Sequence, residues 1–557
     1  MSKTVEDEFE DAEIVDVEPD PTLLWSGETV LVHKRKKSNV VSGGVNLLNT
    51  IIGAGILSIP FAMARQGLVF GAFLVLFVAF LSHVSMMMLG RVGERILQDY
   101  QSSVAGVNLS EGPGSPTGAP DALMSPPSGS LIGSDEDDDV EVGVEGGKSS
   151  PNGHSHGGVM SPPMSPTPGM PTSSSRVDLL DAGQKASVVT EPRVTFPWAA
   201  KRVQPWTAIL LDVGMILFCL GACLAYLILI GDALPQVIGF IVDERPSAAA
   251  SSLSESVASS LSSSAVSEAA APVRLAVLRR RELWISIAVV IVAPFTFAKR
   301  LDVLKYLSWG TVVCVAYLLA MLIYYFVHDY DRIFAPGNTY DLGPRSTSAI
   351  NNISVIVFSY TCQPNFFSVF DELGEPRRRQ RANCSSAIAC AASGTLYALF
   401  GVLGYFIGGR GVADNVVNSL PKYDTPVLIA RLALVFVVTF SLPILFHPMR
   451  ICFESMFTAP RFQRVSEATR RYIIAAVLVL VLWAIALAFK DLGIVLSLTG
   501  ATGATILSFI VPGYLIWAAF PDARACPRGW FPILGLALAI FGVLFMIASV
   551  VLTFVNL

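Results

Sequence analysis

Eleven apolar runs, each about 20 residues long, constrain this chain more than any other feature, because a run of that length crosses a bilayer as an α-helix. Inside the hydrocarbon such a helix makes all its backbone hydrogen bonds internally. The chain is 52% hydrophobic, with a mean hydropathy of +0.57. We therefore predict an all-α polytopic membrane protein with eleven transmembrane helices. They cover residues 40–64, 67–90, 206–231 (extending at most to 242), 283–298, 303–327, 350–371, 385–408, 426–448, 471–489, 491–519 and 531–555.

Basic residues orient the predicted helices, because cytosolic loops carry an excess of lysine and arginine. With a cytosolic N-terminus, the basic runs 34–37 and 377–381 both lie on the cytosolic side. The run 279–281 falls outside and is the exception. We predict a multi-pass membrane protein whose N-terminus is cytosolic.

Polar segments interrupt the apolar runs and divide the chain. The longest is rich in serine, proline, glycine and aspartate, a composition that cannot bury enough apolar surface to fold alone. Its Ser-Pro pairs make kinases or adaptor proteins expected partners of this insert and of the tail. The predicted organisation is a disordered cytosolic tail, spans 1–2, a disordered cytosolic insert, span 3, a Ser/Ala-rich outer loop and spans 4–11, at residues 1–38, 39–98, 99–203, 204–245, 246–280 and 281–557.

Several classes of protein are excluded. The residues show no phosphate-binding loop, no nucleophile beside a base and no paired carboxylates, so we expect no enzyme, no catalytic residue and no cofactor. The eight cysteines fall mostly within apolar runs, which argues against a disulfide framework or a metal site. The net charge of −5 gives no support for a nucleic-acid partner.

The segment 46–62, NLLNTIIGAGILSIPFA, carries the clearest local signal. Gly53, Ala54 and Gly55 lie at its centre and Pro60 follows, a composition that lets a membrane helix unwind. Unwound backbone is tolerated where it lines a cavity and holds a ligand, as in the broken helices of secondary transporters. The alternative is close helix packing through small residues.

The chain resembles the amino acid/auxin permease family, in the branch of sodium-coupled neutral amino acid transporters and vacuolar amino acid exporters. The resemblance covers all eleven apolar runs and is carried by VNLLNTIIGAGILSIPFAMARQG at 45–67, CLGACLAYLILIGD at 219–232, RLDVLKYLSW at 300–309, TFSLPILFHPMR at 439–450 and the glycine-rich run 491–519. It implies a leucine-transporter-like 5+5 inverted repeat plus one extra helix. Spans 1 and 6 would then break at the bilayer centre, where the substrate binds.

A free amino acid brings a carboxylate, which suits the exposed N–H groups of a helix N-terminus, and an ammonium, which suits exposed carbonyls. In the first span we predict substrate contacts from the backbone of Ile52, Gly53, Ala54 and Gly55. In the sixth span Pro364 predicts the break, and we expect contacts from Thr361, Gln363 and Asn365. The alternative for these three polar residues is hydrogen bonding between helices.

The coupling ion is expected to be Na⁺ or H⁺. The resemblance implies that Asn49 and Thr439 contribute to a sodium site, and Ser441 offers a further oxygen. Such oxygens also serve as polar contacts between helices. For proton coupling the candidates are Asp212 and Glu454, since carboxylates within or beside membrane spans are commonly functional.

The leading hypothesis is a secondary active transporter of small, neutral L-amino acids that works by alternating access. The expected partners are the amino-acid substrate and the lipid bilayer, and the expected location is the vacuolar or lysosomal membrane or the plasma membrane. A second hypothesis is an amino-acid sensor that signals through its cytosolic insert. An ion channel fits less well, because the sequence contains no filter motif.

Overall fold

The computed structural model describes residues 39–110, 194–243, 278–297, 308–335, 338–344, 349–374, 376–422, 424–456, 466–521 and 529–555. Nearly all of them belong to one compact unit, His33–Ala105 together with Glu191–Leu557. Within these residues every regular element is a helix, which confirms the all-α class for this part of the chain. The predicted tail 1–38, most of the insert 99–203 and most of the outer loop 246–280 lie outside the described residues.

The helices follow one another as α1 (Val40–Ile51), η2 (Ala54–Ser58), α2 (Ile59–Gln66), α3 (Leu68–Ser110), α4 (Phe196–Val203), α5 (Pro205–Asp243), α7 (Arg281–Phe297), α8 (Ser308–His328), α9 (Tyr330–Ile333), α10 (Ala349–Ser359), α11 (Gln363–Leu373), α12 (Arg378–Gly408), η4 (Gly409–Gly411), η5 (Val416–Ser419), α13 (Thr425–Met456), α15 (Glu467–Ala488), α16 (Leu492–Thr499), η6 (Gly500–Ala504), η7 (Ile506–Ile510), α17 (Val511–Ala519) and α18 (Phe531–Val555).

Among the described residues, nine helical segments are long and apolar enough to span a membrane, and the bent pair α1 and η2–α2 makes a tenth. The predicted run 283–298 corresponds to α7, which has only 17 residues. The chain is therefore a multi-pass membrane protein. The count of eleven spans and the 5+5 inverted repeat remain predictions.

Helices occupy both ends of the predicted insert 99–203. Helix α3 continues to Ser110, since no glycine or proline lies between residues 94 and 105 and Arg95 pairs with Asp99 at 3.3 Å one turn further on. At the other end α4 is helical because the Thr195 hydroxyl accepts a hydrogen bond from the backbone N–H of Trp198. Its apolar face is buried through Phe196 and its neighbours.

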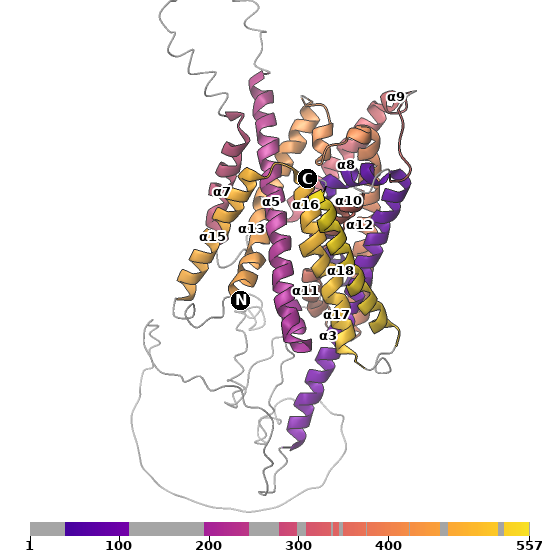
Figure 1. Ribbon diagram of the computed structural model, residues 1–557, viewed down its shortest axis with the longest axis vertical. Helices are drawn as coiled ribbons and strands as arrows, with labels where there is room; N and C mark the ends of the chain where they lie inside the picture. Colours follow the sequence, from indigo (N-terminus) through magenta and orange to yellow (C-terminus); the bar gives the residue numbers. More distant parts are fainter. Residues whose placement is uncertain are drawn as a thin grey trace, which may run out of the picture. The chain divides into compact units, whose positions relative to one another are not determined.

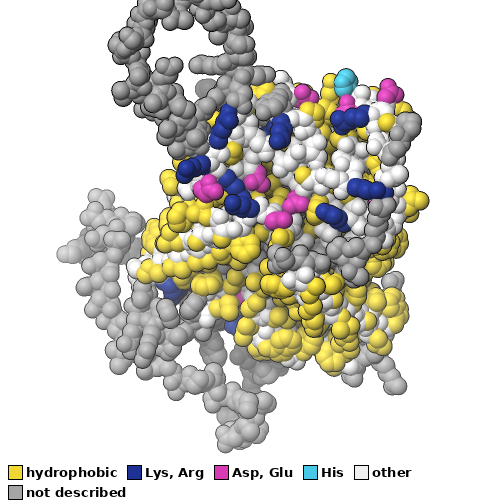
Figure 2. Space-filling model, turned by 45° about the horizontal axis from the view of Figure 1, so that its top comes forward, with side chains coloured by type: hydrophobic (Ala, Val, Ile, Leu, Met, Phe, Trp, Pro, Cys, Tyr) yellow, Lys and Arg dark blue, Asp and Glu magenta, His cyan; other side chains and the backbone are white. Residues whose placement is uncertain are grey.

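Three segments form the interior of the bundle. In the apolar stretch of each span, the buried share is 72% for 205–240, 78% for 352–373 and 83% for 492–519. The corresponding share is below one third for α15 and α18. Helix α5 packs along α13 and also against α7, α16 and η6 (Figure 1). Figure 2 shows the charged side chains gathered at the end of the bundle that carries α9, above a broad hydrophobic surface. Of these three buried segments, 352–373 is one of the two spans that the sequence predicts to contact the substrate.

Candidate functional site

The first break separates α1 from η2. Helix α1 ends at Ile51, and the axis of the following helix is bent by 57° relative to it. Gly53 is fully extended between them, at φ −141° and ψ −157°. The N–H of Ile52 still donates to Leu48 O at 2.9 Å, so the backbone departs from the helix at Gly53. The chain thus breaks at the small residues that the sequence singles out.

The second break separates α10 from α11 at residues 360–362, within the segment predicted to break. The N–H groups of Tyr360 and Thr361 bond three residues back, to Val357 O and Phe358 O, both at 3.2 Å. This tighter turn ends the helix, and Pro364 starts α11 at a position that requires no N–H. Both breaks therefore expose backbone groups inside the bundle.

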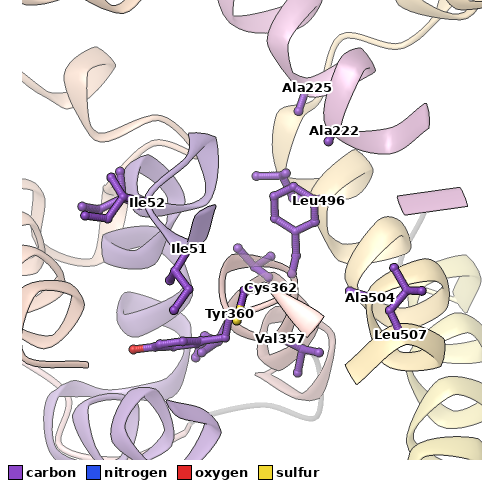
Figure 3. Packing of buried hydrophobic residues seen from close by; sticks show 14 of the residues in the cluster. Ile51, Ile52, Ala222, Ala225, Val357, Tyr360, Cys362, Leu496, Ala504 and Leu507 are labelled. Carbon is purple, nitrogen blue, oxygen red and sulfur yellow. The ribbon is translucent and has the colours of Figure 1, made fainter. Parts of the chain in front are cut away.

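The two breaks lie against each other. A Cβ added to Gly55 would overlap Ser359 Oγ and lie 3.0 Å from Ser359 Cα. Tyr397 of α12 joins the same two segments, since its hydroxyl donates to Ile51 O at 2.6 Å and lies 3.4 Å from Ser359 O. Figure 3 shows Ile51 next to Tyr360 and Cys362. Gly55 is thus a packing contact between the two broken spans.

Gly53 differs from Gly55 because it borders open space. A Cβ added to Gly53 would meet only the hydroxyl of Tyr226, at 3.7 Å. Tyr226 lies on α5, where it is 8% exposed. Of the two glycines, Gly53 is therefore the one at which an added side chain has room, on the side that faces the Tyr226 hydroxyl.

Thr361 and Gln363 take part in a buried hydrogen-bond network. The Thr361 hydroxyl donates to Val357 O at 3.0 Å, and the Gln363 amide bonds to Ser82 of α3 and to Ser508 of η7. Asn365 lies elsewhere, and its Nδ2 donates to Thr50 Oγ1 of α1 at 2.7 Å. Of the three polar residues predicted near the second break, only Asn365 reaches an exposed partner.

A polar stripe on α1 leads to the first break. Its members Ser42, Asn46, Asn49 and Thr50 recur at helical spacing and are exposed or half-buried, whereas the opposite face of α1 packs on α12. Within the described part of the chain, Asn49 Oδ1 is buried and has no hydrogen-bond partner. A buried amide oxygen without a donor is costly, so this atom is suited to a bound cation.

Thr439 offers oxygens to a cation in two ways. Its hydroxyl donates to Val435 O at 2.6 Å, so the hydroxyl lone pairs stay available. Pro443 lies inside α13 four residues later and has no N–H to bond the Thr439 carbonyl. Ser441 is on the same continuous helix, about 200° around its axis from Thr439, and therefore on another face.

Asp212 and Glu454 approach neighbouring groups at the junction of α5, α13 and α15. The hydroxyl of Ser455 donates to Asp212 Oδ2 at 2.6 Å. Glu454 Oε1 accepts from Arg470 Nε at 2.8 Å, and Arg450 lies 3.7 Å from its other oxygen. The charge of Glu454 is thus balanced by two guanidinium groups.

The segment between α12 and α13, which contains η4 and η5, covers the first break at one end of the bundle, here named the outer end. Its residues Val416 and Val417 are fully buried, and η5 packs on η2. Arg431 of α13, 1% exposed, secures the segment by donating to Lys422 O at 2.9 Å. The segment is therefore packed over the first break at the outer end.

Asp414 ties this cover to α16. Its Oδ2 accepts from Gly493 N at 3.1 Å, and Asp491, which caps α16 through Ile494 N, is in side-chain hydrogen-bond contact with it. Burial and then the neighbouring Asp491 carboxylate raise the pKa of Asp414 to about 6, although Gly493 N–H and Arg65 of α2 act in the opposite direction.

The sequence missed several residues that the fold brings to the breaks, namely Tyr226, Tyr397, Ser82, Ser508 and Thr50 as a partner of Asn365. It also passed over His83, whose Nδ1 lies 2.9 Å from Ser386 Oγ. Serine and tyrosine are common in membrane helices, so only the rule that ionisable residues within spans deserve notice would have selected His83.

Known proteins resemble this chain along most of its length. The profile of the family described as "Transmembrane amino acid transporter protein" matches residues 36–104 and 197–555. Vacuolar amino acid transporter 5 of Schizosaccharomyces pombe is 24% identical over 526 residues, which cover 92% of this chain and 93% of that protein. Vacuolar amino acid transporter 5 of Saccharomyces cerevisiae is 26% identical, covering 64% and 83%. Sodium-coupled neutral amino acid transporter 7 of Mus musculus is 25% identical, covering 61% and 68%.

Proposed function

Because this chain belongs to the transmembrane amino acid transporter family, we propose that it is a secondary active transporter of small, neutral L-amino acids that works by alternating access. The observation that carries the proposal is the meeting of two broken spans, joined by Tyr397 and by the contact of Gly55 with Ser359, in the interior of the bundle. The relatives are named as transporters, which favours transport over the sensor hypothesis. The insert on which the sensor hypothesis depends lies mostly outside the described residues.

The substrate would bind beside Gly53. The N–H groups of Ala54 and Gly55 begin the helical segment 54–66 and have no partner within it, so they suit a carboxylate, whereas the N–H of Ile56 donates to Gly53 O at 3.3 Å. On the facing side stands the Tyr226 hydroxyl, a further hydrogen-bonding group for the same ligand. Carbonyl oxygens at the ends of α1 and α10 would receive the ammonium group.

We expect a sodium ion to be the coupling ion, because Asn49 and Thr439 each offer an oxygen that suits a metal cation. Amide, hydroxyl and carbonyl oxygens do not change protonation near neutral pH, so such a site binds a metal cation in preference to a proton. Asp212 and Glu454 remain the candidates for proton coupling. Under that alternative His83 joins them, since its imidazole titrates near neutral pH in water.

The described conformation would be open toward the inner end, opposite the η4–η5 cover. The support is the asymmetry of the two ends: the cover buries Val416 and Val417 over the first break, whereas the polar stripe of α1 is exposed or half-buried. Alternating access then requires the cover to lift and the α1 stripe to become buried. With a cytosolic N-terminus, the inner end faces the cytosol.

We place the protein in a vacuolar or lysosomal membrane, with the plasma membrane as the alternative, because its relatives include both vacuolar and sodium-coupled transporters. Kinases or adaptor proteins would act on the tail and the insert.

The test is uptake of a radiolabelled mixture of neutral L-amino acids into proteoliposomes under an imposed sodium or proton gradient. We expect accumulation under one gradient and its loss in Gly53→Leu, whose side chain would fill the gap facing Tyr226. Binding of the mixture without flux under either gradient would favour the sensor instead.

A further inference from the structure

Two of the backbone groups freed at the second break are satisfied by side chains. Ser82 Oγ of α3 donates to Tyr360 O at 3.1 Å, and Cys362 N donates to Gln363 Oε1 at 3.0 Å. Unpaired backbone groups inside a membrane protein cost several kcal/mol each. The break is therefore held by the protein itself before any ligand arrives.

Ser508 also contacts the side chains at the second break. It lies in η7, a π-helical turn, and its hydroxyl is 2.9 Å from Gln363 Oε1 and 3.3 Å from Thr361 Oγ1. The backbone carbonyl of Ser508 precedes Pro512 by one turn and is bonded by Ser85 of α3. π-Helical turns occur frequently at functional sites.

Counting protons fixes the orientation of the Gln363 amide. Ser82 gives its only hydroxyl proton to Tyr360 O, so it must accept from Gln363 Nε2, at 3.1 Å. Gln363 Oε1 then faces Ser508 Oγ and Cys362 N. Both lone pairs of this oxygen are in use, and Gln363 is 0% exposed. Its side chain is thus unable to accept a hydrogen bond from a substrate.

We infer that Ser82 and Ser508 are positioning residues, which hold the Gln363 amide and through it the backbone of residues 360–362 in the conformation that binds substrate. Gln363 acts as the link between α3, η7 and the break. The consequence for transport rests on the proposed function, whereas the effect on the backbone does not.

Hydrogen–deuterium exchange of the purified protein tests the backbone effect. In Ser508→Ala the amide exchange of residues 360–366 should rise about tenfold, the size expected for loss of one buried hydrogen bond. Ser508→Thr, which keeps the hydroxyl, should restore protection. Ser82→Ala should act like Ser508→Ala, and it gives a second reading if one variant folds poorly. Ser549→Ala, a fully buried serine of α18, should leave these residues unchanged.

A double variant tests whether Ser508 acts on the backbone of residues 360–362 through the Gln363 amide. In Gln363→Leu the amide is absent, so adding Ser508→Ala should give no further increase in exchange at 360–366. Fold-changes that multiply in the double variant, or unchanged exchange in Ser508→Ala, would overturn the inference.

Uptake of the neutral L-amino acid mixture supplies the second readout. We expect Ser508→Ala to raise KM several-fold while the maximal rate per molecule changes less, because the site is disordered but not removed. Faster exchange at 360–366 with an unchanged KM would contradict a positioning role in transport. If the unaltered protein shows no uptake, the proposed function fails, and the exchange results still decide whether Ser82 and Ser508 hold the break.

Discussion

The Tyr397 hydroxyl lies 2.6 Å from the carbonyl oxygen of Ile51, the last residue of α1, and 3.4 Å from that of Ser359, the last residue of α10. One side chain on a third helix thus contacts the ends of both broken spans. Because Tyr397 is fully buried, water cannot replace its hydroxyl. The two breaks are therefore fixed relative to each other by α12.

Tyr397→Phe should abolish most transport at a small cost in stability, because it removes one hydrogen bond, worth about 1 kcal/mol, without creating a large cavity. Thermal unfolding in detergent and proteoliposome uptake measure the two effects. Tyr405→Phe is the matched control, since Tyr405 is also buried on α12 and its hydroxyl accepts from Asp341 N at 2.9 Å, away from the breaks. Equal loss of uptake in both variants would argue against a special role for Tyr397.

Gly53→Ala should weaken substrate binding, whereas Gly55→Ala should lower stability. The Cβ at Gly55 overlaps Ser359, so that variant should lose about 1–3 kcal/mol of stability through overpacking. The Cβ at Gly53 has room, so that variant should keep its unfolding temperature but bind substrate less tightly. Unfolding temperature and KM of each variant separate the two cases. A stable Gly55→Ala with normal uptake would contradict the contact with Ser359.

Asn49→Ala and Thr439→Ala should each raise the sodium concentration needed for half-maximal uptake by tenfold or more, about 1.4 kcal/mol or above, since each removes an oxygen from the proposed ion site. Ser441→Ala is the control, because Ser441 lies on another face of α13. If the sodium dependence of uptake is unchanged in Asn49→Ala, the buried Asn49 oxygen does not bind the cation.

Acid should stabilise the η4–η5 cover. The docked cover raises the pKa of Asp414 to about 6, above the 3.9 of an exposed aspartate, so the docked form binds a proton more tightly. This contribution is fully present below about pH 4 and is lost as the pH rises through 6. The unfolding temperature should therefore fall between pH 4 and pH 6 more steeply in the wild type than in Asp414→Asn.

Asparagine at position 414 keeps an acceptor for Gly493 N and adds a donor for Asp491, so the cover should stay docked at either pH. Asp331→Asn on α9 is a control that should retain the wild-type pH dependence. An Asp414→Asn protein that is as sensitive to pH as the wild type would assign the effect to other groups.

The sequence predicted the breaks well and their surroundings poorly. Small residues at 53–55 and Pro364 are local signals, because glycine and proline affect the backbone directly. Residues such as Ser82, Ser508 and Tyr397 approach the breaks only through the packing of distant helices, and no local pattern marks them. The helical continuation of α3 to Ser110 was missed because the composition of the whole insert outweighed its first residues.

The different environments of the predicted polar residues could not be read from spacing either. Gln363 and Asn365 are two residues apart, yet one is enclosed between α3 and η7 and the other reaches Thr50 of α1. Positions two apart on a helix point to opposite sides, so one face of α11 contacts the bundle interior and the other contacts the first span.

Counterflow tests the central claim most directly, because it requires one site that is exposed alternately to the two sides of the membrane and needs no ion gradient. Proteoliposomes are loaded in turn with each unlabelled neutral L-amino acid, and a trace of the same labelled amino acid is added outside. We predict a transient accumulation of label above its equilibrium value for at least one substrate, abolished in Gly53→Leu. Entry that only approaches equilibrium would indicate a channel, and no entry for any of the amino acids would contradict transport altogether.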